Sequence, residues 1–150
     1  MHRHDKDLLT VFISGGRTTA VFEGEAPKTD TFVLGVVRYR RAGFAHSTRN
    51  DGSSDFRAVL LEFDHPQGPS QGGGSGDLFC TDRFCVHEFT IAPGASLAGK
   101  GEAFFVPLGN TVVSDSGRQH SHPDGTIWRG RYGWINSGAG TARVMAITPR

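Results

Sequence analysis

Short runs of hydrophobic residues alternate with polar positions along most of the chain, and glycine-rich turns separate the runs. Runs of this kind, rich in Val, Ile, Thr and Phe, are typical of β-strands, and no segment shows the periodicity of an amphipathic helix. Because the runs follow one another closely, we expect a compact antiparallel meander in the first half of the chain. Its expected strands are Leu8–Ser14, Thr18–Phe22, Thr31–Tyr39, Phe44–Thr48 and Phe56–Phe63.

A segment without core-forming residues divides the chain. Residues 65–77 consist mainly of Gly, Pro, Ser and Gln, a composition that cannot pack a core and that indicates a flexible connector. We therefore predict an N-terminal half over residues 1–64 and a C-terminal half over residues 78–150. The length of 150 residues suits one ordinary domain or two very small ones.

The composition narrows the class of protein. The chain contains 21 glycines and 11 phenylalanines, which agrees with an all-β fold. A formal net charge of +1 provides no basic surface for nucleic acid, so no nucleic-acid partner is expected. No signal-like or membrane-spanning apolar run occurs, so no membrane partner is expected and the predicted location is cytoplasmic.

The two cysteines, Cys80 and Cys85, allow two interpretations. They could pair across a tight hairpin, or they could remain two small core residues in a reducing cytosol. The expected cytoplasmic location favours the second interpretation. Two thiols alone also make a poor structural zinc site.

Three histidines of the N-terminal half carry the candidate chemistry. Side chains alternate between the two faces of a strand, so His2 and His4 project to the same side and present two imidazoles together. A turn at Gly43, followed by the strand that begins at Phe44, would place His46 on the facing wall. Three imidazole nitrogens leave open positions on a metal ion for water, oxygen or a substrate. His2, His4 and His46 are therefore the predicted metal ligands.

The segment from Gly35 to Asn50 resembles the second conserved motif of the cupin superfamily, G-x5-P-x-G-x2-H-x3-N. Gly35, Gly43, His46 and Asn50 stand at the places of the motif, and Arg41 takes the place of its proline. The resemblance implies an all-β cupin fold, a double-stranded β-helix or jelly-roll barrel, in two small tandem repeats. It also implies a divalent transition metal as cofactor: Fe, Mn, Zn or Ni.

The start of the chain resembles the first cupin motif, G-x5-H-x-H-x3,4-E-x6-G, less fully. His2 and His4 supply the paired histidines, whereas Leu8 or Leu9 stands where the family has a glutamate ligand. The leading glycine of the motif is missing, since the chain begins at Met1. A three-histidine site without the acidic ligand is similar to that of the cupin thiol and gentisate dioxygenases.

The C-terminal half resembles a degenerate copy of the same motifs. A glycine-rich turn, an arginine and an apolar strand follow Asn136, as they follow Asn50, so we expect an internal repeat of about 85 residues. The places of the ligands fall at Lys100–Glu102 and at Tyr132 or Gly133, and the second half is therefore predicted to lack a metal site.

Another H-x-H pair, His120 and His122, lies at an expected turn between the two motifs of the second half. A metal site is one interpretation of the pair. We favour a solvated polar loop, because polar residues close to Pro and Gly are typical of turns.

Alternation also predicts a substrate pocket, because side chains on the face of the histidines would line it. That pocket is mainly apolar, and Arg38 or Arg40 could provide an anchor for a carboxylate. The expected lining residues are Thr10, Phe12, Phe44 and Thr48.

The resemblance to cupin enzymes implies a metal-dependent enzyme that acts on a small organic molecule, either dioxygenase-like or lyase- or isomerase-like. A non-catalytic small-molecule-binding or structural cupin module is the alternative, and the missing glutamate favours it. In that case His2 and His4 could belong to a frayed N-terminus, with His46 as a lone barrel histidine. A barrel that begins at its first ligand also lacks a strand over one sheet edge, so we predict a homodimer.

Overall fold

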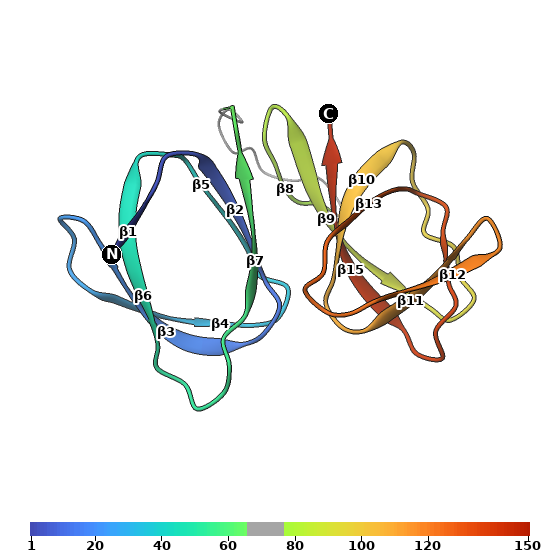
Figure 1. Cartoon of the computed structure of the whole chain (residues 1–150), viewed down its shortest axis with the longest axis horizontal. Coiled ribbons are helices and arrows are strands. Elements are labelled where there is room, and N and C mark those ends of the chain that lie inside the picture. Colours follow the sequence, from blue (N-terminus) through green and yellow to red (C-terminus); the bar gives the residue numbers. More distant parts are fainter. Residues whose placement is uncertain (66–76) are drawn as a thin grey trace. The chain divides into compact units, whose positions relative to one another are not determined.

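The computed structural model of the chain describes residues 1–65 and 77–150, and it divides into two compact units, Met1–Gln67 and Gly68–Arg150. We call these the first unit and the second unit. Both are built of β-strands, and no helix occurs in the described ranges (Figure 1). No helix long and apolar enough to cross a membrane is therefore present in them. The predicted connector, residues 65–77, falls almost entirely outside the described residues.

The first unit contains seven strands in two antiparallel sheets, whose orders are β1-β6-β3-β4 and β5-β2-β7. In Figure 1 these strands, coloured blue to green, surround a common interior. Their bounds are β1 His2–His4, β2 Asp7–Phe12, β3 Gly16–Phe22, β4 Lys28–Phe32, β5 Val37–Arg40, β6 Phe44–Asn50 and β7 Ala58–Phe63.

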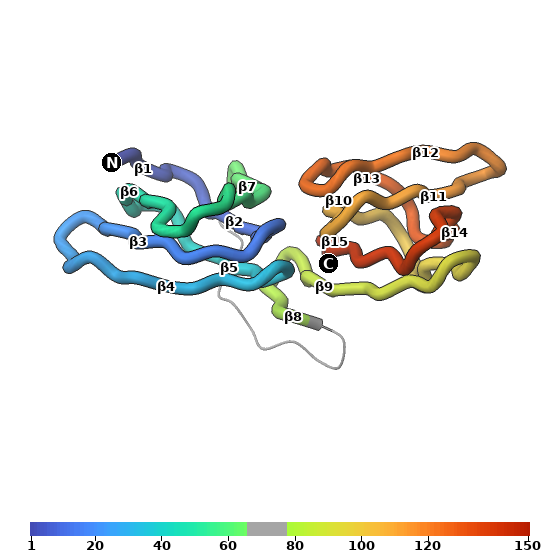
Figure 2. The backbone as a smooth tube through the Cα atoms, turned by 90° about the horizontal axis from the view of Figure 1, so that it is seen from below, coloured from blue at the N-terminus to red at the C-terminus, as the bar shows by residue number. Residues whose placement is uncertain are grey.

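Strand pairing in the first unit joins segments that are distant in the sequence. β1 pairs with β6, with His2 opposite His46, and β2 lies between β5 and β7 (Figure 2). The expected meander, in which successive strands pair in order, is therefore wrong. The apolar faces of two sheets must cover one another, and this requirement, rather than nearness in sequence, decides which strands pair. The observed order is that of a jelly roll.

The run Thr31–Tyr39, expected as one strand, forms the end of β4 and most of β5. Gly35 separates them with a φ of 88°, a conformation that favours glycine. Its amide donates a hydrogen bond of 2.8 Å to the carbonyl of Phe12. The turn moves the chain from one sheet to the other, so β4 and β5 lie on opposite sides of the interior.

The second unit contains eight strands in two sheets, β13-β10-β15-β9-β8 and β12-β11-β14. Its interior is filled by aromatic side chains around Phe105, which is fully buried and contacts the rings of Trp128, Tyr132 and Trp134 at centroid distances of 5.2 to 5.8 Å. The strands are β8 Asp77–Cys80, β9 Phe84–Ile91, β10 Glu102–Pro107, β11 Thr111–Asp115, β12 Arg118–His122, β13 Trp128–Arg131, β14 Ile135–Asn136 and β15 Ala142–Pro149.

The polar loop expected at His120 and His122 is wrong, because both residues belong to β12, which pairs with β11. The ring of His122 stacks on Trp128, with ring centroids 3.9 Å apart and planes inclined by 15°. Burial against this ring, with a smaller effect of His120, lowers the pKa of His122. Trp128, the apolar partner that favours a strand here, lies on β13. The sequence around His122 does not reveal this contact.

The cysteines form a disulfide, which is the interpretation that the sequence did not favour. Cys80 and Cys85 are direct partners across the hairpin of β8 and β9. A tight turn brings them together: the amide of Thr81 donates to the carbonyl of Phe84 at 2.8 Å, and the Thr81 hydroxyl accepts from the amide of Phe84 at 3.1 Å.

Candidate metal centre

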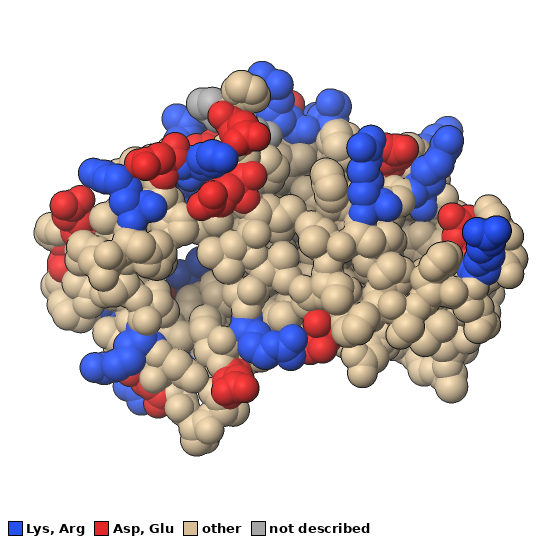
Figure 3. Space-filling model, in the orientation of Figure 1, with Lys and Arg blue, Asp and Glu red and all other residues tan. Residues whose placement is uncertain are grey.

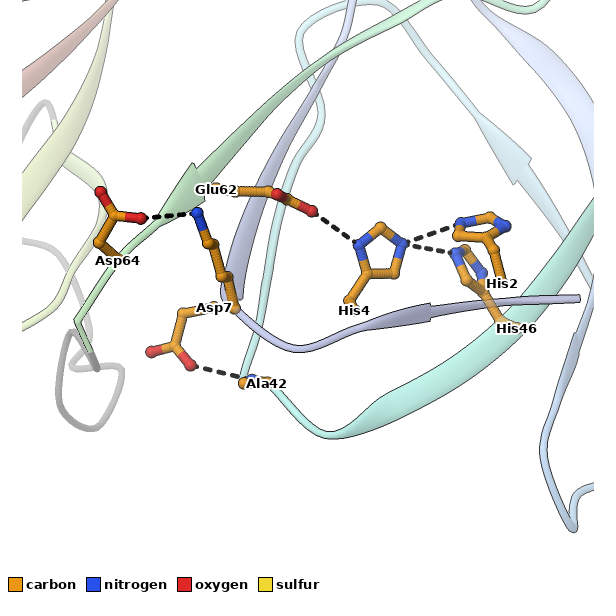
Figure 4. Close-up of polar contacts among 8 residues, drawn as sticks. His2, His4, Asp7, Ala42, His46, Glu62 and Asp64 are labelled. Carbon is orange, nitrogen blue, oxygen red and sulfur yellow. Dashed lines mark hydrogen bonds and ion pairs between the residues drawn. The ribbon is translucent and has the colours of Figure 1, made fainter.

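The first unit brings together the three histidines that the sequence singles out, from two neighbouring strands. His2 and His4 lie on β1 and His46 lies on β6. The Nε2 atom of His4 is 2.9 Å from Nε2 of His2 and 3.2 Å from Nε2 of His46 (Figure 4). In the described parts of the chain, these three form the only group of His, Cys, Asp or Glu side chains arranged to share a metal ion. We call them the histidine cluster.

A carboxylate contacts one member of the histidine cluster on the side of its ring that faces away from the other two. Oε1 of Glu62 on β7 lies 3.1 Å from Nδ1 of His4, whose side chain is almost fully buried (Figure 4). A carboxylate only accepts hydrogen bonds, so Nδ1 of neutral His4 carries the proton and its Nε2 keeps a free lone pair. That lone pair faces His2 and His46. The Thr48 hydroxyl lies 3.4 Å from Nδ1 of His46. There it can accept the Nδ1 proton of that ring, as Glu62 does for His4.

Glu62 was not among the residues predicted from the sequence. Two features of its position on β7 connect it to the site. It follows Ala58 and Leu60 at alternate positions of β7, and both of these line the interior cavity. It also stands opposite Leu8, one of the two leucines at the place of the family's glutamate ligand. Position 8 of β2 thus offers no carboxylate, while Glu62 of the neighbouring strand contacts a histidine on the side away from the cluster.

The donor set fits a divalent transition metal. Two nitrogen ligands at right angles on an ion, with bonds of about 2.1 Å, stand about 3 Å apart. The Nε2 separations of 2.9 and 3.2 Å from His4 are close to that spacing, and the three ligand atoms all lie within 4.8 Å of one another. Neutral imidazoles suit iron, nickel and zinc, whereas manganese prefers oxygen ligands. The cluster is therefore better suited to the first three metals than to manganese.

His46 is kept neutral by its surroundings. Burial of the ring, together with the nearby His2, His4 and Arg40 side chains, lowers the pKa of His46 to about 4. The rings of Phe22 and Phe44 lie against it, at centroid distances of 5.3 and 5.4 Å. A metal ligand must be deprotonated, so this histidine is ready to bind a cation at neutral pH without first releasing a proton.

The cluster borders a cavity of about 530 Å³ inside the first unit, and Figure 3 shows this unit hollowed, with Lys or Arg atoms inside the hollow. His2 and His46 line the cavity. All four expected pocket residues line it as well: Thr10, Phe12, Phe44 and Thr48. Further residues also line the cavity, although the sequence did not point to them. Five lie on β3 and β4, whose pairing was not predicted, and Phe56 precedes β7: Thr18, Phe22, Lys28, Asp30, Phe32 and Phe56.

No protein-family model matches the sequence, and no curated protein is significantly similar to it. Solved structures resemble it in fold. A cupin 2 conserved barrel domain protein from Leptotrichia buccalis is 10% identical over 100% of this chain and 76% of its own, with a TM-score of 0.57. Protein Ylba from E. coli is 20% identical over 99% of this chain and 69% of its own, with a TM-score of 0.63.

A third match is the oxalate decarboxylase of Lactobacillus farciminis, at 12% identity and a TM-score of 0.58, over 98% of this chain and 71% of that one. Strand order, interior cavity and these likenesses define an all-β protein of the cupin fold. The fold that the Gly35–Asn50 motif implied is thereby confirmed.

Proposed function

We propose that the first unit is a metal-dependent enzyme site for a small organic molecule, with His2, His4 and His46 as metal ligands and the adjoining cavity as substrate pocket. The observation that supports it most is the convergence of three Nε2 atoms at the wall of that cavity. The likeness to cupin barrels supports a small-molecule substrate, since oxalate decarboxylase is among the matches.

Each residue of the site has a definable task. Glu62 and Thr48 orient the rings of His4 and His46, and Phe22 and Phe44 pack against the ring of His46. The Thr10 hydroxyl offers a hydrogen bond inside the cavity. A bound metal would supply Lewis acidity or a place for oxygen to bind.

A dioxygenase-like reaction is the first candidate within this class. Lyase or isomerase chemistry needs a side chain that moves protons. Among the described residues that line the cavity, the one carboxylate is that of Asp30, which is paired with Arg38 at 3.2 Å and with Lys28 at 3.9 Å. A carboxylate already held by two cations is engaged in those ion pairs and is not free to contact a substrate. This leaves the histidine cluster as the reactive part of the cavity.

Metal content tests the proposal. Protein reconstituted with iron, zinc or nickel and then desalted should retain about one metal ion per chain, measured by elemental mass spectrometry. A His46→Ala variant should lose the ion, whereas His120→Ala, which removes an exposed histidine of the second unit, should retain it. Wild-type protein that retains no metal would contradict the proposal and favour the alternative, a non-catalytic small-molecule-binding module.

The cytoplasmic location predicted from the sequence remains a prediction. The Cys80–Cys85 disulfide weighs against it, because such bonds persist mainly in oxidising compartments. Alkylation of protein taken directly from its native cells, followed by mass spectrometry, measures the thiol state and so tests this prediction.

A further inference from the structure

The cavity of the first unit contains an arginine whose charge is not balanced. Of the described residues, three with Lys or Arg side chains and one with a carboxylate, Asp30, line it. Asp30 is shared by Lys28 and Arg38, as described above. Arg40 has no acidic partner among residues 1–65 and 77–150. Arg40 is exposed, yet its side chain also lines the cavity, so its guanidinium is available to an anionic group of a ligand there.

Arg40 is held next to the histidine cluster. Its guanidinium lies 3.9 Å from the ring centroid of Phe22 and 5.1 Å from that of Phe44, and both rings also contact His46. Stacking on aromatic faces restricts the guanidinium, while its N–H groups, which point outward in its plane, stay free to hydrogen-bond. The group is thus oriented to bind a carboxylate through two parallel hydrogen bonds beside the proposed metal ligands.

A second group of side chains gives the cavity an apolar part. Phe12, Phe32 and Phe56, which we call the aromatic trio, contact one another with ring centroids 4.1 to 5.5 Å apart. All three line the cavity. The trio lies away from the cluster along the sheet: Phe22 is opposite His46 at one end of β3, and Phe32 is opposite Gly16 at the other.

We propose that the cavity takes a small organic carboxylate with a flat, apolar body, whose carboxylate binds Arg40 and whose body extends towards the aromatic trio. This rests on the proposed function, since it names the ligand class of the same cavity. The cavity volume of about 530 Å³ suits a ligand of that size. Flat rings are favoured because phenylalanine rings stack on them.

Benzoate and benzamide are suitable probes, because they have nearly the same shape and differ in charge. Isothermal titration calorimetry of metal-free protein should show benzoate binding at least tenfold more tightly than benzamide. The Arg40→Met variant should lose this preference. Arg41→Met is the matched control: it removes the same charge from the next residue, which does not line the cavity, and should keep the preference.

The Arg40→Lys variant covers the case in which Arg40→Met does not fold. It keeps the charge but not the paired N–H groups, and should weaken benzoate binding while circular dichroism stays unchanged. Equal binding of the two probes to wild-type protein, or a preference that survives in Arg40→Met, would overturn the inference.

The measurement on metal-free protein separates this inference from the proposed function. A benzoate preference that depends on Arg40, in protein that retains no metal, would support the carboxylate site and contradict the metal-dependent enzyme. Retained metal without any benzoate preference would support the metal-dependent enzyme and contradict the carboxylate site.

Discussion

At the scale of single residues, the contact between Glu62 and His4 holds the His4 ring in one orientation within the proposed metal site. Outer carboxylates of this kind fix the tautomer and orientation of a ligating histidine and make it a better donor. Here the carboxylate comes from β7, opposite Leu8 of β2, and stays on the far side of the imidazole from the cluster. In the proposed metal site Glu62 is therefore a positioning residue, and its loss should weaken metal binding without removing a ligand.

Replacing Glu62 by alanine should lower zinc affinity about 10-fold to 100-fold, because His4 loses the partner that holds its Nδ1 proton. Competition with a chromogenic chelator measures the change. Glu25→Ala removes an exposed carboxylate of the same unit and is the control. Unchanged affinity in Glu62→Ala would show that the 3.1 Å contact has no influence on the site.

Among the elements, β6 and its counterpart explain why the two units differ. Asn50 and Asn136 make the same turn: each side-chain oxygen accepts from the amide two residues on, and each side-chain amide donates to the carbonyl four residues on. A glycine with positive φ, Gly43 or Gly133, precedes each turn. Asn50 follows its glycine by seven positions and Asn136 by three, so the second unit lacks the segment that would contain a counterpart of His46.

This comparison also shows how far the sequence predicts the structure. The places of Gly35, Gly43, His46 and Asn50 were recognisable because each depends on a local property, a turn or a strand face. The shortened β14 was not recognisable, because counting back from Asn136 assumes that the segment keeps its length. Glu62 was missed for a related reason, since its contact with His4 depends on a pairing between distant strands.

The two asparagines should contribute differently to stability. Asn136 is buried and makes a further hydrogen bond, of 2.9 Å, to the carbonyl of Ile91, whereas Asn50 is exposed. At about 1 kcal/mol for each hydrogen bond, with an added cost for buried groups left unpaired, Asn136→Ala should lower the free energy of unfolding by about 3 kcal/mol. Asn50→Ala should lower it by about 1 to 2 kcal/mol. Urea unfolding monitored by circular dichroism measures both, and equal losses would contradict the difference in burial.

Across the whole molecule, one unit is hollow and the other is filled. The first unit encloses a cavity of about 530 Å³ with histidines and cations in its wall, while the second packs Phe105 and its neighbouring rings in its interior. Buried apolar area stabilises a fold, and cavities and desolvated polar groups reduce that stabilisation. The first unit should therefore be the less stable of the two.

Thermal unfolding should show two transitions. Both tryptophans, Trp128 and Trp134, belong to the second unit, so their fluorescence should report the later transition, while circular dichroism reports both. Zinc at about a hundredfold its Kd stabilises the folded state by about 2.7 kcal/mol. It should raise the first transition by roughly 10 °C or more and leave the tryptophan transition in place. Equal shifts in both signals would show that the units unfold together.

The homodimer expected from the sequence remains a prediction. In the first unit β1, β4, β5 and β7 are edge strands, and unpaired edges are a common route to association. Light scattering after size exclusion, at micromolar concentration, should give twice the chain mass of 16.2 kDa. A mass equal to that of one chain would contradict it.

The shared asparagine turn has a consequence for the history of the chain. Two halves that repeat the same glycine and asparagine turns, yet are filled differently, are best explained by duplication of one ancestral barrel. The two copies differ by four residues between the glycine and the asparagine, and only the longer segment contains a histidine. The two copies now have different interiors: histidines and cations line the cavity of the first, and aromatic rings pack the interior of the second.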